Sequence, residues 1–156
     1  MLKILTIFLI LILILIYAPS VWAFNTVKFY DGDNITIIHG GIKAQVHLAC
    51  IDAPELKQVK GQAARKALKA LVNNQPFEVN ILGHDSLGRF SAEIISDRGN
   101  INKILVDQGY AEFYNPSGKG CEGYEIAEKN AQSQHLGIWA KGINIQSALE
   151  FRKESY

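Results

Sequence analysis

Four carboxylates lie at two turns of the chain, in a pattern that could bind a metal ion and activate a water molecule. Asp31 and Asp33 flank a glycine between two predicted strands, and Asp52 and Glu55 flank an Ala-Pro pair after an apolar segment. Acidic residues also favour turns for purely structural reasons. If the two turns converge, however, the carboxylates repel one another, and a hard divalent cation relieves that repulsion. Oxygen ligands favour Ca²⁺ or Mg²⁺ over zinc, and a remaining carboxylate can act as a general base.

Arg89 adds a cation to this set. It follows Gly88 at the mouth of a predicted hairpin, where an arginine is commonly a surface residue. Beside a metal site its planar guanidinium could instead clamp a phosphate with two hydrogen bonds. A metal, a base and a cationic clamp together make up the machinery of phosphoryl transfer.

The elements that must position these side chains follow from the hydrophobic pattern. The predicted strands cover residues 25–30, 35–39, 42–50, 77–81 and 90–94, and the predicted helices cover residues 61–73, 100–108 and 122–135. The first helix has an apolar stripe of Ala64, Leu68, Leu71 and Val72. This order predicts a mainly β protein with α (the α+β class), built as a five-stranded Greek-key barrel of the OB type, since a sandwich needs about seven strands or more.

Residues 1–23 have the pattern of a secretory signal peptide. Lys3 precedes an apolar run over residues 4–17, and small or β-branched residues, Val21 and Ala23, precede the expected cleavage point. An uncleaved anchor is the alternative, but the apolar run is shorter than the roughly 20 residues that span a bilayer. We therefore expect a secreted or periplasmic protein with one domain over residues 24–142 and a polar C-terminal tail over residues 143–156.

Charge and cysteine content limit the class of protein. The 156 residues carry a net charge of +1, and without Lys3 the basic and acidic residues are equal in number. This excludes a uniformly basic nucleic-acid coat and a polybasic membrane anchor. Cys50 and Cys121 are the two cysteines. In an oxidising compartment they suggest one disulfide, although two independent buried thiols remain an alternative.

Taken together, these motifs resemble the staphylococcal nuclease (thermonuclease) family over residues 25–140. The resemblance is carried by four strings in the family's order: Asp31-Gly32-Asp33, Val46-His47-Leu48-Ala49-Cys50-Ile51-Asp52-Ala53-Pro54-Glu55, Asp85-Ser86-Leu87-Gly88-Arg89 and Leu136-Gly137-Ile138-Trp139. It implies an OB-fold barrel with three helices and a Ca²⁺-dependent phosphodiesterase that acts on DNA and RNA. The two cysteines resemble those of a secreted bacterial subgroup, which favours the disulfide.

The resemblance also implies a role for individual residues. Asp33 and Asp52 would bind calcium, together with the backbone carbonyl of Ala53. Glu55 would be the general base, and Arg89 would bind the phosphate and stabilise the charge of the transition state. The implied cut is at the 5′ oxygen–phosphorus bond, which leaves 3′-phosphate ends.

Three positions depart from the family pattern. His47 stands where the family usually has arginine, Asn34 where it has threonine, and Leu87 where it has an aromatic residue. His47 lies on the polar face of its strand, so we expect it to face the site as a catalytic residue, with a solvated strand histidine as the alternative. Imidazole is neutral above about pH 6.5. If the reaction needs a charged His47, activity falls as pH rises through its pKa.

Weaker signals allow other readings of the surface. A basic cluster could steer a polynucleotide, or it could simply be the outer face of a helix: Lys57, Lys60, Arg65, Lys66 and Lys69. The aromatic residues Tyr110, Phe113 and Tyr114 could stack on bases or belong to the core. We expect a monomer with a nucleic-acid substrate and no stable membrane association after signal cleavage. The rival hypotheses are a nucleic-acid-binding module disabled by His47 and an envelope-anchored scaffold.

Overall fold

The structure is a computed structural model that describes residues 25–39, 41–116, 118, 120–143 and 146–154. The predicted signal peptide over residues 1–23 therefore lies outside the described residues. Within the described ranges, no helix has the length and apolar character needed to cross a membrane.

Five longer strands form the main sheet, and they are the five that the sequence predicts. They are β1 (Asn25–Phe29), β2 (Asn34–His39), β3 (Ile42–Leu48), β5 (Glu78–His84) and β6 (Phe90–Ser96). They pair in the order β1-β2-β3-β6-β5, and the β3–β6 pair is parallel whereas the other pairs along this order are antiparallel. The predicted α+β class with five main strands is thereby confirmed.

Three further strands have two residues each. Strand β7 (Gly99–Asn100) pairs with β6, and β4 (Ile51–Asp52) pairs with β8 (Glu112–Phe113) as a separate two-stranded sheet. Strand β8 lies in a segment expected to be extended, residues 110–114, whereas β4 and β7 were not predicted. Such short pairs carry too few alternating residues to be recognised from sequence. The β4–β8 pair matters for function because it contains Asp52.

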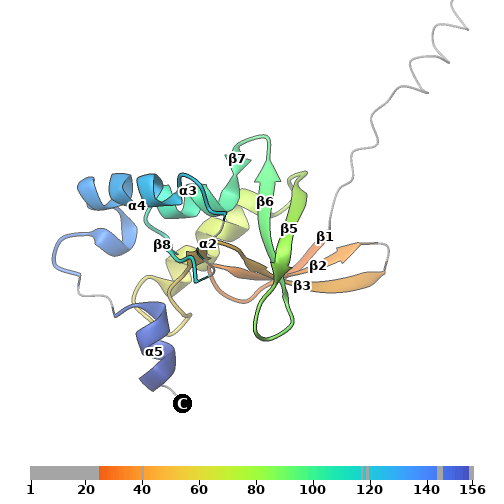
Figure 1. Ribbon diagram of the computed structural model, residues 1–156, viewed down its shortest axis with the longest axis horizontal. Helices are drawn as coiled ribbons and strands as arrows, with labels where there is room; N and C mark the ends of the chain where they lie inside the picture. Colours follow the sequence, from red (N-terminus) through yellow and green to blue (C-terminus); the bar gives the residue numbers. More distant parts are fainter. Residues whose placement is uncertain (1–24, 40, 117, 119, 144–145, 155–156) are drawn as a thin grey trace, which may run out of the picture.

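The helices gather beside the sheet, away from the tip of the β2–β3 hairpin (Figure 1). They are α2 (Gly61–Val72), α3 (Ile101–Asp107), α4 (Tyr124–Ser133), the 3-10 turn η1 (Gly137–Trp139) and α5 (Ala148–Glu154). The first three correspond to the predicted helices. Helix α5 differs from the prediction of a polar tail over residues 143–156.

A capping box explains why α5 forms. The Ser147 hydroxyl accepts a hydrogen bond from the Glu150 amide at 3.2 Å, and the Glu150 carboxylate accepts one from the Ser147 amide at 3.4 Å. Ala148 is 4% exposed, so the helix is docked on the domain by its first turn.

The core lies between the main sheet and the helices. Helix α2 buries its predicted apolar stripe, and side chains from β2, β3, β6 and α3 meet it: Ile35, Leu48, Ile94, Ile101 and Leu105 are almost inaccessible to solvent. Full burial of each such side chain contributes about 1.5–3 kcal/mol relative to exposure. This core gives the loops at the end of β3 a rigid base.

Asn102 and the disulfide fix the segment that leaves β3. Asn102 is fully buried and donates hydrogen bonds to the carbonyls of Ala49 at 2.9 Å and Ala92 at 3.0 Å. Cys50, which follows Ala49 in the chain, forms a disulfide with Cys121, with a Cα–Cα distance of 5.5 Å. The predicted disulfide is therefore present, and it holds the chain two residues before Asp52.

Candidate functional site

Asp31 shapes the first acidic turn. Its Oδ1 accepts hydrogen bonds from the backbone amides of Asp33 at 3.1 Å and Asn34 at 2.8 Å. The Asn34 side chain amide also donates to both Asp31 oxygens. These are the bonds of an Asx turn, so Asp31 acts as a turn former and leaves Asp33 to face the interior.

Gly32 allows this turn to approach α2 closely. A Cβ atom at this position would lie 2.6 Å from the Ala64 Cβ and 2.7 Å from the Ala53 Cβ. Real side chains do not tolerate such contacts, so glycine is required for the turn to sit against both residues. The approach of Gly32 to Ala53 also brings the first acidic turn, which contains Asp31 and Asp33, against the second acidic turn, which contains Asp52 and Glu55.

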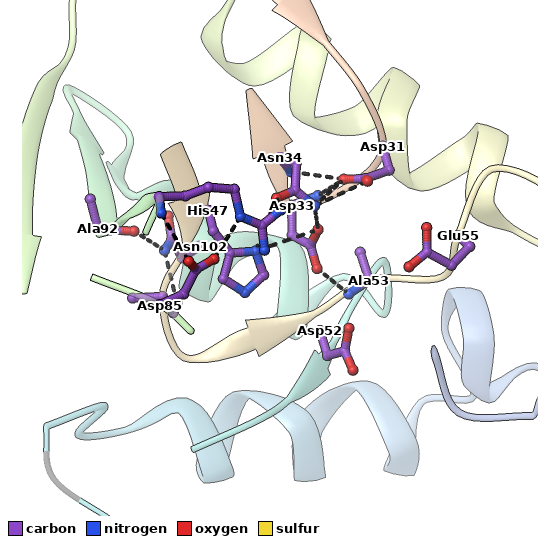
Figure 2. A network of polar contacts seen from close by, with 12 residues as sticks. Asp31, Asp33, Asn34, His47, Asp52, Ala53, Glu55, Asp85, Ala92 and Asn102 are labelled. Carbon is purple, nitrogen blue, oxygen red and sulfur yellow. Dashed lines mark hydrogen bonds and ion pairs between the residues drawn. The ribbon is translucent and has the colours of Figure 1, made fainter. Parts of the chain in front are cut away.

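Asp33 joins the two acidic turns directly. Its carboxylate is buried, at 2% exposure, and its Oδ2 accepts a hydrogen bond from the Ala53 amide at 2.7 Å. Figure 2 shows this bond, with Asp52 and Glu55 beside Ala53. Burial, the charge of Asp31 and, to a smaller extent, that of Asp52 raise the pKa of the Asp33 carboxyl well above its ordinary value. A cation at this position would relieve that destabilisation.

Asp52 and Glu55 share a partner that sequence reasoning missed. Arg152 of α5 donates from Nη1 to Asp52 Oδ1 at 3.0 Å and from Nη2 to Asp52 Oδ2 at 2.8 Å. Its Nη1 also donates to Glu55 Oε1 at 3.0 Å. The capping box could have predicted α5, but no local signal indicates that its arginine reaches residues about 100 positions earlier.

Arg89 is held in place by the hairpin that precedes it. Its Nε donates to Asp85 Oδ2 at 2.6 Å, and its backbone amide donates to Asp85 Oδ1 at 2.9 Å. Burial opposes ionisation of Asp85, but the hydrogen bonds from Arg89 outweigh it and lower the pKa of that carboxyl. Arg89 Nη1 also donates to the Asn34 side chain oxygen, so Asn34 connects the arginine to the first acidic turn.

His47 faces the same network and is not a solvated strand histidine. Its Nδ1 lies 3.2 Å from the Asn34 side chain oxygen and 3.9 Å from Asp33 Oδ1. Burial and then the positive charge of Arg89 lower its pKa below the ordinary value. The neutral imidazole is therefore favoured at neutral pH, unlike the arginine that the family usually has there.

The donor set fits a hard cation. Within the described residues, no three His, Cys, Asp or Glu side chains converge as a metal site, but the expected set needs only two carboxylates and the Ala53 carbonyl. Asp33 and Asp52 are both buried acids on either side of Ala53. The raised pKa of Asp33 and the ion pair between Arg152 and Asp52 show that positive charge is favourable beside these two carboxylates.

An open hollow adjoins the site on the side of Arg89. It has a volume of about 260 Å³, and its walls include Arg89, Asn34, Tyr30 and Gln45. A substrate group bound to Arg89 would therefore have space beside it.

The weaker sequence candidates lie outside this network. Tyr110 and Phe113 pack against the core, whereas Tyr114 is 37% exposed. Leu87 is exposed at the hairpin tip. Of the basic cluster, Lys57, Lys66 and Lys69 are exposed, as an outer helix face would be.

Comparison with known proteins agrees with this geometry. The family model of staphylococcal nuclease homologues matches residues 45–141. The chain is 35% identical over 131 residues to an uncharacterized endonuclease of Haemophilus influenzae, covering 83% of this chain and 73% of that protein. It is 33% identical to the micrococcal nuclease of Shigella flexneri, covering 91% and 88%, and 31% identical to an endonuclease of Bacillus subtilis, covering 71% and 58%. The chain therefore belongs to the staphylococcal nuclease family.

Proposed function

We propose that the protein is a secreted, calcium-dependent phosphodiesterase that cuts DNA and RNA internally. The observation that carries the proposal is the hydrogen bond from the Ala53 amide to Asp33, because it brings the two acidic turns together. Asn34 then links this pair to Arg89. The relatives named as endonucleases and micrococcal nuclease support the same reaction class.

Asp33, Asp52 and the Ala53 carbonyl would hold the calcium ion. Bound calcium supplies positive charge that stabilises the negative charge developing on the phosphate. The two aspartates come from separate turns, so the site exists only when the turns are in contact. The raised pKa of Asp33 means that the ion must compete with a proton for this carboxylate.

Glu55 and Arg89 would carry the remaining steps. Glu55 would accept a proton from the attacking water while the water oxygen forms a bond to phosphorus and the bond between phosphorus and the 5′ oxygen breaks. The leaving 5′ oxygen takes up a proton from solvent, and the phosphate stays on the 3′ side. Arg89 donates hydrogen bonds to the phosphate oxygens, on which charge builds up. Asp85 positions Arg89 by the 2.6 Å ion pair, so the guanidinium is already oriented before substrate binds.

The test is cleavage of single-stranded DNA and of RNA with calcium or with a chelator. We expect calcium-dependent cleavage, reduced by a factor of about 10²–10³ in Glu55→Gln and Arg89→Ala. Glu78→Gln is the matched control, because Glu78 is an exposed carboxylate on β5. No calcium-dependent cleavage between about pH 5 and pH 10 would overturn the proposal.

A second candidate is a nucleic-acid-binding module with weakened or absent catalysis. The lowered pKa of His47 favours it, because a neutral imidazole cannot replace the positive charge of arginine. His47→Arg separates the two candidates. A rate increase of orders of magnitude identifies a weakened enzyme, whereas unchanged inactivity with persistent DNA binding identifies the binding module.

Secretion rests on the N-terminal sequence and is tested separately. We propose cleavage after Ala23, which the Cys50–Cys121 disulfide supports because disulfides persist in oxidising compartments. Mass spectrometry of the mature protein should find Phe24 as its first residue. An intact N-terminus would instead support the membrane anchor, and a sizing experiment would test the expected monomer.

A further inference from the structure

We propose that helix α5 is an autoinhibitory element whose Arg152 occupies the carboxylates needed for metal binding and proton transfer. This inference rests on the function proposed above for Asp52 and Glu55. It concerns a residue outside the matched family segment, which ends at residue 141.

The contact has the geometry of a strong ion pair. The planar fork of Arg152 meets both oxygens of Asp52, at 3.0 and 2.8 Å, in the bidentate arrangement that is typical of arginine and carboxylate. One nitrogen of the fork also meets Glu55 Oε1 at 3.0 Å. Asp52 is 5% exposed, so solvent competes little for these bonds.

The carboxylates of Asp52 and Glu55 both have other partners in the proposed reaction. Calcium would have to bind the Asp52 oxygens that accept bonds from Arg152. Glu55 would have to accept a proton from water with a carboxylate that is already paired. The guanidinium and a bound ion are therefore alternative partners of Asp52, and binding of one opposes binding of the other.

The approach of α5 to the site is specific. The Gln58 side chain donates to the Gln146 carbonyl at 2.9 Å, and the same amide group accepts a hydrogen bond from the Glu55 backbone at 2.7 Å. One side chain thus ties the segment before α5 to the turn that carries Glu55. The buried Ala148 provides a second anchor at the start of the helix.

The contacts that hold α5 at the site are few enough for the helix to leave it reversibly. Helix α5 has seven residues, and helices of that length are not stable without tertiary contacts. Arg152 is 37% exposed, and Leu149 is exposed to a similar extent, at 38%. An open state in which α5 has left the carboxylates is therefore accessible, and calcium would select it.

Calcium affinity in the absence of nucleic acid tests the proposal. The apparent dissociation constant is the intrinsic one divided by the fraction of open molecules. We expect Arg152→Gln to lower the calcium dissociation constant about tenfold, measured by titration calorimetry. Lys153→Gln is the matched control, because Lys153 has the same charge on the same helix but is exposed; its dissociation constant should stay within about twofold of the unmodified protein's. An unchanged calcium affinity in Arg152→Gln would overturn the proposal.

Hydrogen exchange separates displacement of α5 from loss of a positive charge. In the unmodified protein, the amides of residues 149–154 should exchange faster in saturating calcium than with chelator. Equal exchange in the two conditions would show that calcium leaves Arg152 in place, and the proposal would be wrong even if Arg152→Gln binds calcium more tightly.

The outcome is also distinct from that of the proposed function. Tighter calcium binding by Arg152→Gln and faster exchange in α5, without any cleavage, would support autoinhibition of the metal site and contradict the nuclease. No calcium binding by either protein would contradict both.

Discussion

Asn34 is the residue that connects the parts of the candidate site. Its side chain oxygen accepts from Arg89 and lies 3.2 Å from His47, whereas its nitrogen donates to Asp33 at 2.6 Å. The family usually has threonine here, whose single hydroxyl oxygen is both donor and acceptor, whereas the asparagine amide carries its donor and its acceptor on separate atoms. The departure at His47 and the departure at Asn34 are thus neighbours in space, which the sequence separation of 13 conceals.

His47 sets the first prediction, which concerns pH. Its pKa is lowered by burial and then by Arg89, so the folded protein holds the neutral imidazole already at about pH 6.5. We therefore expect kcat/KM to rise on the acid side as the general base ionises and then to show no fall between about pH 6.5 and pH 8. This differs from the fall that a charged His47 would cause.

The measurement is the pH profile of kcat/KM for the unmodified protein and for His47→Gln, which keeps a neutral side chain that can form hydrogen bonds. The two profiles should have the same shape. A fall near pH 6.5 that is present in the unmodified protein and absent from His47→Gln would contradict the prediction.

At the scale of elements, the β4–β8 pair contains an unfavourable charge. Glu112 of β8 lies opposite Asp52 of β4. Burial, followed by the charges of Asp52, Glu128 and Glu150, raises the pKa of Glu112 to about 6. This pKa exceeds that of Glu112 in the unfolded chain, so the folded state binds the proton more tightly. The stability that protonated Glu112 contributes is therefore lost as pH rises from about 4.5 through about 6.

We therefore expect Glu112→Gln to stabilise the protein by about 1 kcal/mol at pH 7, a value reduced from the full linkage term because the side chain is partly exposed. Between about pH 4.5 and pH 6, the free energy of unfolding should also decrease less in this variant than in the unmodified protein. Denaturant unfolding with chelator present measures both, with Glu78→Gln as the control. Equal pH dependence in the two variants would show that Glu112 ionises without cost.

Strands and helices could be predicted from the sequence where their hydrophobic pattern extends over many residues. The alternation in β3 and the stripe of α2 are strong periodic signals. Helix α5 was missed because seven residues with one capping box carry little periodicity, and its docking depends on Gln58, which is distant in sequence. Asn102 was also missed, since only the fold shows that its amide meets carbonyls from β6 and from the residue after β3.

The disulfide acts on the whole molecule. It links residues separated by 71 positions, and closing such a loop in the unfolded chain is worth about 4 kcal/mol in the chain-entropy model. We expect the double variant Cys50→Ala, Cys121→Ala to lose about this much free energy of unfolding. Denaturant unfolding with and without reductant measures the effect. Reductant should destabilise the unmodified protein and leave the double variant unchanged; an equal response of both would contradict the prediction.

The sequence by itself determined the α+β class, the five longer strands and the family resemblance, and it favoured a disulfide between the two cysteines. These features depend on local periodicity and on short strings of residues, which the sequence displays directly. Only the tertiary structure decided that Asp33 bonds to Ala53, that Asn34 joins His47 to Arg89, and that Arg152 reaches Asp52 and Glu55. The physical reason is that such contacts join residues from 13 to about 100 positions apart, and their geometry depends on how the core packs the elements together.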